Sequence, residues 1–315
     1  MRLAAVWGAS GFVGRNLAAV LVDDGWQVRA LVRSPELLPE SIKSLVSDVR
    51  KLDFGSSDDE IVDALNDVEV VFHCAGDPSS DPVECQRYID ATKRLIYAAQ
   101  NIGVGRLIHL STVGVYGAQG RKTVDITNPL AGSTQYALSR IEAERVVLAA
   151  DGGHAGLKAT VVRIPMVIGE GMASNVLQRV YQKLFFGIFF HPGRSVAVLN
   201  CIGIRKLVAI LAAVAEDDFG QSAVIQFGDN ILWTDIVALM ANESGRKITR
   251  MPIPLWMAKA IFFLLTGQSR GKELMVLANE VCFQQTDMKD LNISGELPET
   301  IWDIRKAIAN AIKKS

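Results

Sequence analysis

Short apolar runs alternate with amphipathic stretches through the first half of the chain. The apolar runs predict buried strands, and the amphipathic stretches, whose apolar residues recur at helical spacing, predict helices. Strands that alternate with helices favour an α/β fold built on a doubly wound parallel sheet. The predicted strands lie near 2–7, 27–32, 43–46, 69–74, 106–111 and 159–164, and the predicted helices near 12–23, 58–66, 84–102 and 133–150.

The rhythm changes after Pro165. Residues 171–194 predict a helix and an aromatic loop, and 195–230 hold a strand-helix-strand stretch that we expect to return to the sheet. No low-complexity linker separates the two halves, so we expect two intimate domains that share a cleft. The first covers 1–170 together with 195–230, and a smaller, mostly helical C-terminal domain covers 171–194 and 231–315.

Three glycines join the first predicted strand to the first predicted helix. Gly8 allows a tight turn, Gly11 lets the backbone approach a pyrophosphate, and Gly14 lets the helix pack closely on the strand. The start of the helix offers N–H groups and a positive dipole end to an anion. Strand, loop and helix in this order predict a Rossmann-like dinucleotide site. Its expected loop residues are Gly8, Ser10, Gly11, Phe12, Val13 and Gly14.

Arg33 follows the second predicted strand, 19 residues after Gly14. A site that prefers NAD carries an acidic residue at about this distance, where it binds the ribose hydroxyls. Arginine suits a 2′-phosphate instead, which favours NADP and leaves NAD possible. The alternative interpretation is a solvated arginine at the end of a strand.

Composition narrows the class of protein without naming a function. The 315 residues are 49% hydrophobic and 21% charged, with a net charge of −1, which is typical of a globular protein with a large core. A net charge this close to zero gives no sign of a basic surface that binds nucleic acid. The four cysteines are scattered and form no metal-ligand spacing with the four histidines, so we expect reduced thiols, no metal and a cytoplasmic location.

Two observations argue against a membrane protein. The chain begins with a predicted strand, so we expect no signal segment. Its longest apolar run, 255–265, contains a lysine and is far shorter than the ~20 residues that a membrane span needs.

Two further segments carry candidate chemistry. Thr112 lies at the end of the strand near 106–111, and its hydroxyl is therefore expected at the carboxyl edge of the sheet. Tyr136 and Arg140 are four residues apart in a predicted helix, so they share one face and can point at one ligand. Taken singly, these segments also fit a polar loop and an ordinary amphipathic helix.

Together the segments resemble the extended short-chain dehydrogenase/reductase superfamily, especially its nucleotide-sugar epimerases, dehydratases and reductases. The resemblance covers nearly the whole chain. It implies that Asp48 and Val49 contact adenine after the third strand, and that Thr112 and Tyr136 are the catalytic hydroxyl residues. It also implies that the cofactor lies against the small residues after the fourth strand and meets the segment 163–171 at the nicotinamide. The cofactor contacts implied there are Cys74, Ala75, Gly76, Tyr136, Arg140, Pro165 and Val167.

By this resemblance, Tyr136 exchanges a proton with a hydroxyl or ketone while hydride moves to or from the nicotinamide. Thr112 hydrogen-bonds the same oxygen, and the basic residue on the helix holds the ribose and stabilises the tyrosinate. The family has lysine at the position of Arg140. At ~4–5 Å and an effective dielectric of about 20, either cation contributes about 3–4 kcal/mol. Arginine cannot release a proton into a relay, so reduced activity is an open alternative.

Two smaller departures concern the reaction class. Family dehydratases carry an Asp-Glu pair after the catalytic threonine, and Val113 and Gly114 stand there in this chain, which disfavours dehydration. The family's asparagine in the helix after the fourth strand is replaced by Tyr88.

Three hypotheses for the function follow. The first is an NAD(P)-dependent enzyme acting on a nucleotide-linked sugar, with reduction preferred over epimerisation because Arg33 suggests a dissociable NADPH. The second is an enzyme like 3β-hydroxysteroid dehydrogenase acting on an apolar alcohol, motivated by the apolar segments 184–190 and 254–265. The third is a cofactor-binding protein with impaired catalysis, motivated by Arg140. Family members often dimerise through the helices at 84–102 and 133–150, so a homodimer is possible.

Overall fold

The computed structural model describes most of the chain. It covers residues 2–76, 79–117, 123–153, 156–172, 176–182, 187–192, 197–216, 223–254, 257, 280–287 and 296–313.

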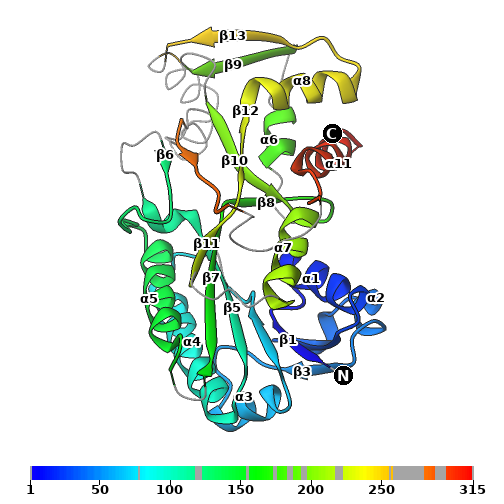
Figure 1. The fold of residues 1–315 in the computed structure, drawn as a ribbon. Coiled ribbons are helices and arrows are strands. Elements are labelled where there is room, and N and C mark those ends of the chain that lie inside the picture. The colour runs from blue at the N-terminus through cyan, green and yellow to red at the C-terminus, as the bar shows by residue number, and fades with distance from the viewer. Residues whose placement is uncertain are drawn as a thin grey trace.

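A seven-stranded parallel sheet forms the centre of the molecule (Figure 1). Its order is β11-β7-β5-β4-β1-β2-β3, and each neighbouring pair is parallel. The order reverses between β1 and β4, which is the switch point where doubly wound sheets bind ligands. The α/β fold predicted from the sequence is confirmed. The strands are β1 (Leu3–Trp7), β2 (Gln27–Val32), β3 (Asp48–Lys51), β4 (Val70–His73), β5 (Arg106–Thr112), β7 (Lys158–Ile164) and β11 (Val224–Gln226).

Helices cover both faces of this sheet and bury the side chains of its central strands on both sides. In Figure 1, α1 (Phe12–Asp23) and α7 (Ile204–Glu216) lie on one face. On the other face lie α3 (Asp58–Leu65), α4 (Pro82–Ile102) and α5 (Gln135–Ala150). Two separate apolar cores result, one on each face. The predicted helices agree with these bounds to within a few residues.

The third strand is not where the sequence pattern put it. Residues 43–46 contain the last residue of the short helix α2 (Glu40–Lys43) and the turn after it, and β3 begins only at residue 48. Helix α2 follows the turn η1 (Pro35–Leu37). This strand is the edge of the sheet and carries charged side chains, as exposed edges commonly do. Its sequence therefore lacks the apolar run from which the other strands were predicted.

A second layer of structure lies beyond the carboxyl edge of the sheet, with its own apolar core. It contains a three-stranded sheet of β8 (Met166–Ile168), β10 (Val198–Gly203) and β12 (Asp229–Leu232). Packed with it are α6 (Val176–Gln182), α8 (Trp233–Ser244) and α11 (Thr300–Lys313). Two small parallel pairs complete the described chain, β9 (Ile188–Pro192) with β13 (Thr249–Ile253), and β6 (Thr123–Val124) with β14 (Cys282–Phe283).

This region differs from its prediction in two respects. Only β11 of the stretch 195–230 joins the large sheet, since β10 pairs with β8 and β12. The predicted aromatic loop holds strand β9, which pairs with β13 within a segment expected to be mostly helical. The division into two domains stays a prediction. No helix in the described ranges is long and apolar enough to span a membrane.

Candidate active site

The glycine loop after β1 has the geometry that a pyrophosphate requires. Gly8 has φ +92°, and a Cβ there would lie 2.7 Å from the backbone nitrogen of Ala75. A Cβ on Gly14 would lie 2.2 Å from the carbonyl oxygen of Gly8, so helix and loop touch through backbone. Helix α1 begins after Gly11, which provides no side-chain cap, and its first turn holds no acidic residue. The loop therefore leaves a helix N-terminus to which a phosphate can bind.

Strand register places most of the other predicted cofactor residues at the same edge. His73 on β4 pairs with His109 on β5, so the Cys74–Gly76 segment lies level with the end of β5. Pro165 directly follows β7, and Val167 lies in β8. Arg33 directly follows β2 and is exposed, and no ion pair joins it to the described part of the chain.

Thr112 ends β5, and a short loop network sets its position relative to α5. Its Oγ1 accepts a hydrogen bond of 3.1 Å from the N–H of Gly114, in the turn η2 (Val113–Tyr116). The carbonyl oxygen of Val115 accepts hydrogen bonds from the N–H groups of Ala131 and Gly132, at 3.0 and 2.9 Å. The segment that leads into α5 is therefore hydrogen-bonded to the turn that Thr112 caps.

Helix α5 presents Tyr136 and Arg140 on one face, as their spacing predicts. The guanidinium carbon of Arg140 lies 4.9 Å from the ring centre of Tyr136 and 3.9 Å from that of Tyr88 on α4. Arg140 is only 6% exposed. Burial acts against its charge, but the adjacent phenols of Tyr88 and Tyr136 raise the pKa of Arg140 above its usual value. A permanent cation therefore lies next to the predicted catalytic tyrosine.

A buried polar network that was not predicted lies behind these residues. Glu144 on α5 receives three hydrogen bonds from the guanidinium of Arg163 on β7, at 2.7 to 3.2 Å. The hydroxyl of Ser111 also donates to this carboxylate. Arg163 donates at 2.9 Å to the hydroxyl of Tyr116, which donates at 2.6 Å to the side-chain oxygen of Gln226. The network joins β5, β7, β11, η2 and α5, and so fixes the surroundings of Thr112.

Spacing alone could have identified the anchor of this network. Glu144 lies four residues after Arg140 and eight after Tyr136, so it shares their helix face. An acid on a buried helix face requires a cationic or hydrogen-bonding partner. Arg163, inside an otherwise apolar strand, is the matching cation.

Under the site lies a cluster of aromatic and histidine rings. His73 stacks on Trp7 with 4.9 Å between ring centres, and its Nε2 lies 3.0 Å from the hydroxyl of Thr92. The Nε2 of His109 lies 3.1 Å from the hydroxyl of Tyr88. Burial lowers the pKa of His73 to about 3 and the pKa of His109 well below its usual value. Both histidines are therefore neutral and serve as packing groups beneath the site.

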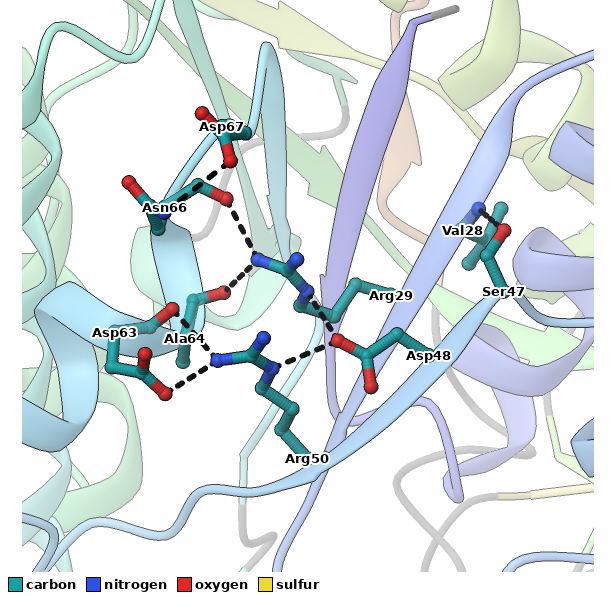
Figure 2. Close-up of polar contacts among 9 residues, drawn as sticks. All are labelled: Val28, Arg29, Ser47, Asp48, Arg50, Asp63, Ala64, Asn66 and Asp67. Carbon is teal, nitrogen blue, oxygen red and sulfur yellow. Dashed lines mark hydrogen bonds and ion pairs between the residues drawn. The ribbon is translucent and has the colours of Figure 1, made fainter.

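Asp48 and Val49 lie within β3 and not after it, and their predicted contact with adenine stays a prediction. Asp48 begins β3 instead of following it, and its carboxylate accepts hydrogen bonds of 2.9 Å from Arg29 and 2.8 Å from Arg50 (Figure 2). Partial burial opposes its ionisation, but the two arginines lower the pKa of Asp48. The first acid beyond the end of β3 is Asp53, whose carboxylate accepts a 2.6 Å hydrogen bond from the N–H of the glycine two residues later.

Comparison with known proteins identifies the family of this chain. Residues 4–188 match the family model described as the NAD dependent epimerase/dehydratase family. The chain is 30% identical over 291 residues to the 3 beta-hydroxysteroid dehydrogenase/Delta 5→4-isomerase of Mycobacterium tuberculosis, covering 84% of this chain and 75% of that relative. It is also 30% identical over 283 residues to the 4-hydroxy-2-methyl-3-oxo-4-farnesyl-3,4-dihydroquinoline-1-oxide ketoreductase of Stigmatella aurantiaca, covering 86% and 81%.

Solved structures agree on the fold. The UDP-Glc/GlcNAc 4-epimerase of Campylobacter jejuni covers 100% of both chains with a TM-score of 0.77 and 14% sequence identity. At that identity the likeness concerns architecture, and the substrate named for that protein is not carried over to this chain.

Proposed function

Because the chain belongs to the NAD dependent epimerase/dehydratase family of extended short-chain dehydrogenases/reductases, we propose that it interconverts a secondary alcohol and its ketone with a nicotinamide cofactor. The catalytic residues in this proposal are Thr112, Tyr136 and Arg140. One observation carries it: the buried guanidinium of Arg140 lies 4.9 Å from the ring centre of Tyr136, on the helix bound to the turn after Thr112. A cation held there is suited to a tyrosine that exchanges protons.

Each of the three catalytic side chains has a separate role in the proposed reaction. When bound, the nicotinamide cofactor supplies the centre that accepts or gives hydride. The oxygen of Tyr136 takes the proton from the alcohol, or returns it to the ketone oxygen, and the hydroxyl of Thr112 hydrogen-bonds that same oxygen. Arg140 provides a positive charge beside Tyr136, but its own proton is not released.

For the substrate, we propose an apolar, ring-bearing alcohol or ketone ahead of the nucleotide-linked sugar. Two relatives at 30% identity support this order, since one is named for a hydroxysteroid and the other for a farnesyl-bearing quinoline. The nucleotide-linked sugar is the second candidate, supported by a relative that is 28% identical over 268 residues and is named as a dTDP-6-deoxy-L-talose 4-dehydrogenase. Residues 184–186 and most of the segment 254–265 lie outside the described residues, so the two apolar segments decide nothing.

A substrate panel tests the proposal. The purified protein is mixed with NADP⁺ or NAD⁺ and either a series of 3β-hydroxysteroids or a series of UDP- and dTDP-sugars, and cofactor reduction is followed. We expect turnover with a hydroxysteroid, and a loss of at least about 100-fold in Tyr136→Phe. Turnover with only the sugars would establish the second candidate. Equal rates for the natural protein and Tyr136→Phe would overturn the catalytic assignment.

We further propose that two copies associate through α4 and α5. The support is an unusual exposure of apolar side chains on these helices: Val83 is 65%, Tyr97 63% and Leu138 46% exposed. Sedimentation equilibrium should give twice the mass of one chain, and the double variant Tyr97→Glu, Leu138→Glu should give a single chain. A single-chain mass for the natural protein would refute the dimer.

A further inference from the structure

The guanidinium of Arg140 is enclosed on three sides. The ring of Tyr88 lies 3.9 Å from its central carbon and the ring of Tyr136 lies 4.9 Å away. The third side is the backbone of Gly76, where a Cβ would lie 2.4 Å from a guanidinium nitrogen. The absence of a side chain at Gly76 thus makes room for the flat end of Arg140.

Tyr88 is itself rigidly held. Its hydroxyl lies 3.1 Å from Nε2 of the buried His109, and its ring contacts that of Phe54 edge-on at 5.7 Å. It is 3% exposed, and burial raises the pKa of its phenol to about 12. Tyr88 is therefore a neutral ring facing a permanent cation, which is the arrangement in which cation–π attraction is strong.

A lysine would not fill this space in the same way. Its ammonium is compact and strongly hydrated, whereas the planar guanidinium stacks on aromatic faces. The chain departs from the family at both positions, with arginine for lysine at 140 and tyrosine for asparagine at 88. The two departing side chains are in direct contact with each other.

We propose that Tyr88 and Arg140 form a matched pair in which Tyr88 is the positioning residue that holds the guanidinium beside Tyr136. Restoring the family lysine at position 140 then lowers activity unless Tyr88 is replaced as well. This inference rests on the proposed function for its kinetic readout.

Charged and neutral groups surround the pair. Arg140 is charged, whereas burial keeps His73 and His109 in the ring cluster neutral. The titratable side chains that face it are Glu84, Cys85 and Tyr88 from α4, Tyr136 and Glu144 from α5, His73 from β4 and His109 from β5.

A double-mutant cycle tests the pairing. We expect Arg140→Lys and Tyr88→Asn each to lower kcat by about 10- to 30-fold, the factor that a desolvated cation–π contact is worth. The double variant should recover to within about threefold of the natural protein, so the two effects are strongly non-additive. Additive losses, or full activity in Arg140→Lys alone, would overturn the pairing.

Two matched variants separate positioning from packing. Tyr88→Phe keeps the ring and should retain activity within about threefold, whereas Tyr88→Leu fills similar space without a π face and should resemble Tyr88→Asn. In Tyr88→Leu the acid limb of the pH–rate profile should also move to higher pH, because the cation is less well placed to stabilise the tyrosinate. Equal losses of activity in Tyr88→Phe and Tyr88→Leu, with no shift of the acid limb, would show that Tyr88 is only a packing residue.

A spectroscopic measurement keeps the pairing testable if no substrate turns over. The near-ultraviolet absorbance of tyrosinate is titrated in the natural protein and in Arg140→Lys, each against its own Tyr136→Phe background. The tyrosinate signal should appear at higher pH in Arg140→Lys and return toward the natural value in the double variant. If the tyrosinate signal shifts in Arg140→Lys and returns in the double variant but no substrate turns over, only the proposed reaction is refuted. If the tyrosinate titration is the same in every variant, only the pairing is refuted.

Discussion

Arg33 is the side chain on which the choice between NADP and NAD is proposed to depend. It extends from the end of β2 with its guanidinium exposed. Replacement by alanine should weaken NADPH binding by at least about 10-fold, because a charge-assisted contact to the 2′-phosphate is worth about 1.5–3 kcal/mol. Binding of NADH, which has no 2′-phosphate, should change by less than about twofold. Fluorescence titrations with both cofactors decide the matter, and an equal loss for both would contradict the role.

At this same scale, the residues that sequence could identify were those fixed by local spacing. A strand end and helical periodicity indicate where Thr112, Tyr136 and Arg140 lie, at the end of β5 and the start of α5, and only the family resemblance implies their catalytic role. Tyr88 and Glu144 act through partners on other elements. Spacing places Glu144 on the helix face of Tyr136 and Arg140, but the partner that each side chain meets depends on how α4, α5 and β7 pack together, which no local sequence pattern encodes.

At the scale of elements, charged side chains add to the backbone pairing that joins β3 to β2. Arg29 on β2 bonds the carboxylate of Asp48 and also the carbonyl oxygens of Ala64 and Asn66 at the end of α3, at 3.1 and 2.8 Å (Figure 2). A cation at a helix C-terminus is stabilising. One buried arginine therefore joins β2, β3 and α3.

Replacing Asp48 by asparagine should destabilise the fold without altering cofactor binding. The change leaves Arg29 without its carboxylate partner in a site where its side chain is 10% exposed, and we expect a loss of about 1–3 kcal/mol in the free energy of unfolding. Urea denaturation measures the loss, and NADPH titration serves as the control. A weaker Kd with unchanged stability would restore the adenine role that the sequence suggested.

Sequence placed the interior strands well and the edge strands poorly. β1, β4, β5 and β7 are apolar runs in which nearly every residue is buried, so hydropathy reveals them directly. β3 is charged, and β9 and β13 each carry a proline and pair only with one another. Such strands are defined by their partners instead of by their own composition.

At the scale of the whole molecule, the buried histidines make stability depend on pH. An unfolded histidine has a pKa of about 6.5, whereas the pKa of His73 in the folded protein is about 3 and that of His109 is also lowered. Between these values the unfolded chain binds more protons, so the free energy of unfolding falls as pH falls below about 6.5. Each histidine contributes at most about 1.4 kcal/mol per pH unit.

Urea denaturation at pH 7.5 and at pH 5.5 measures this dependence. The midpoint should be lower at pH 5.5 in the natural protein, and the difference should shrink in His73→Gln, which has no titrating group at that position. The variant's absolute stability does not enter the comparison, since only the change with pH is read. An identical change in both proteins would show that other groups are responsible.

Gln226 also bears on the order in which the molecule is completed during its synthesis. A ribosome releases the glycine loop and β1 to β7 first, then Gln226, and only afterwards the segment that contains Gln284. The side-chain amide of Gln226 donates to the carbonyl oxygen of Gln284 at 2.7 Å, while its oxygen accepts from Tyr116. The polar contacts of Gln226, which include its hydrogen bond with Tyr116, are therefore complete only after the segment that contains Gln284 has been synthesised.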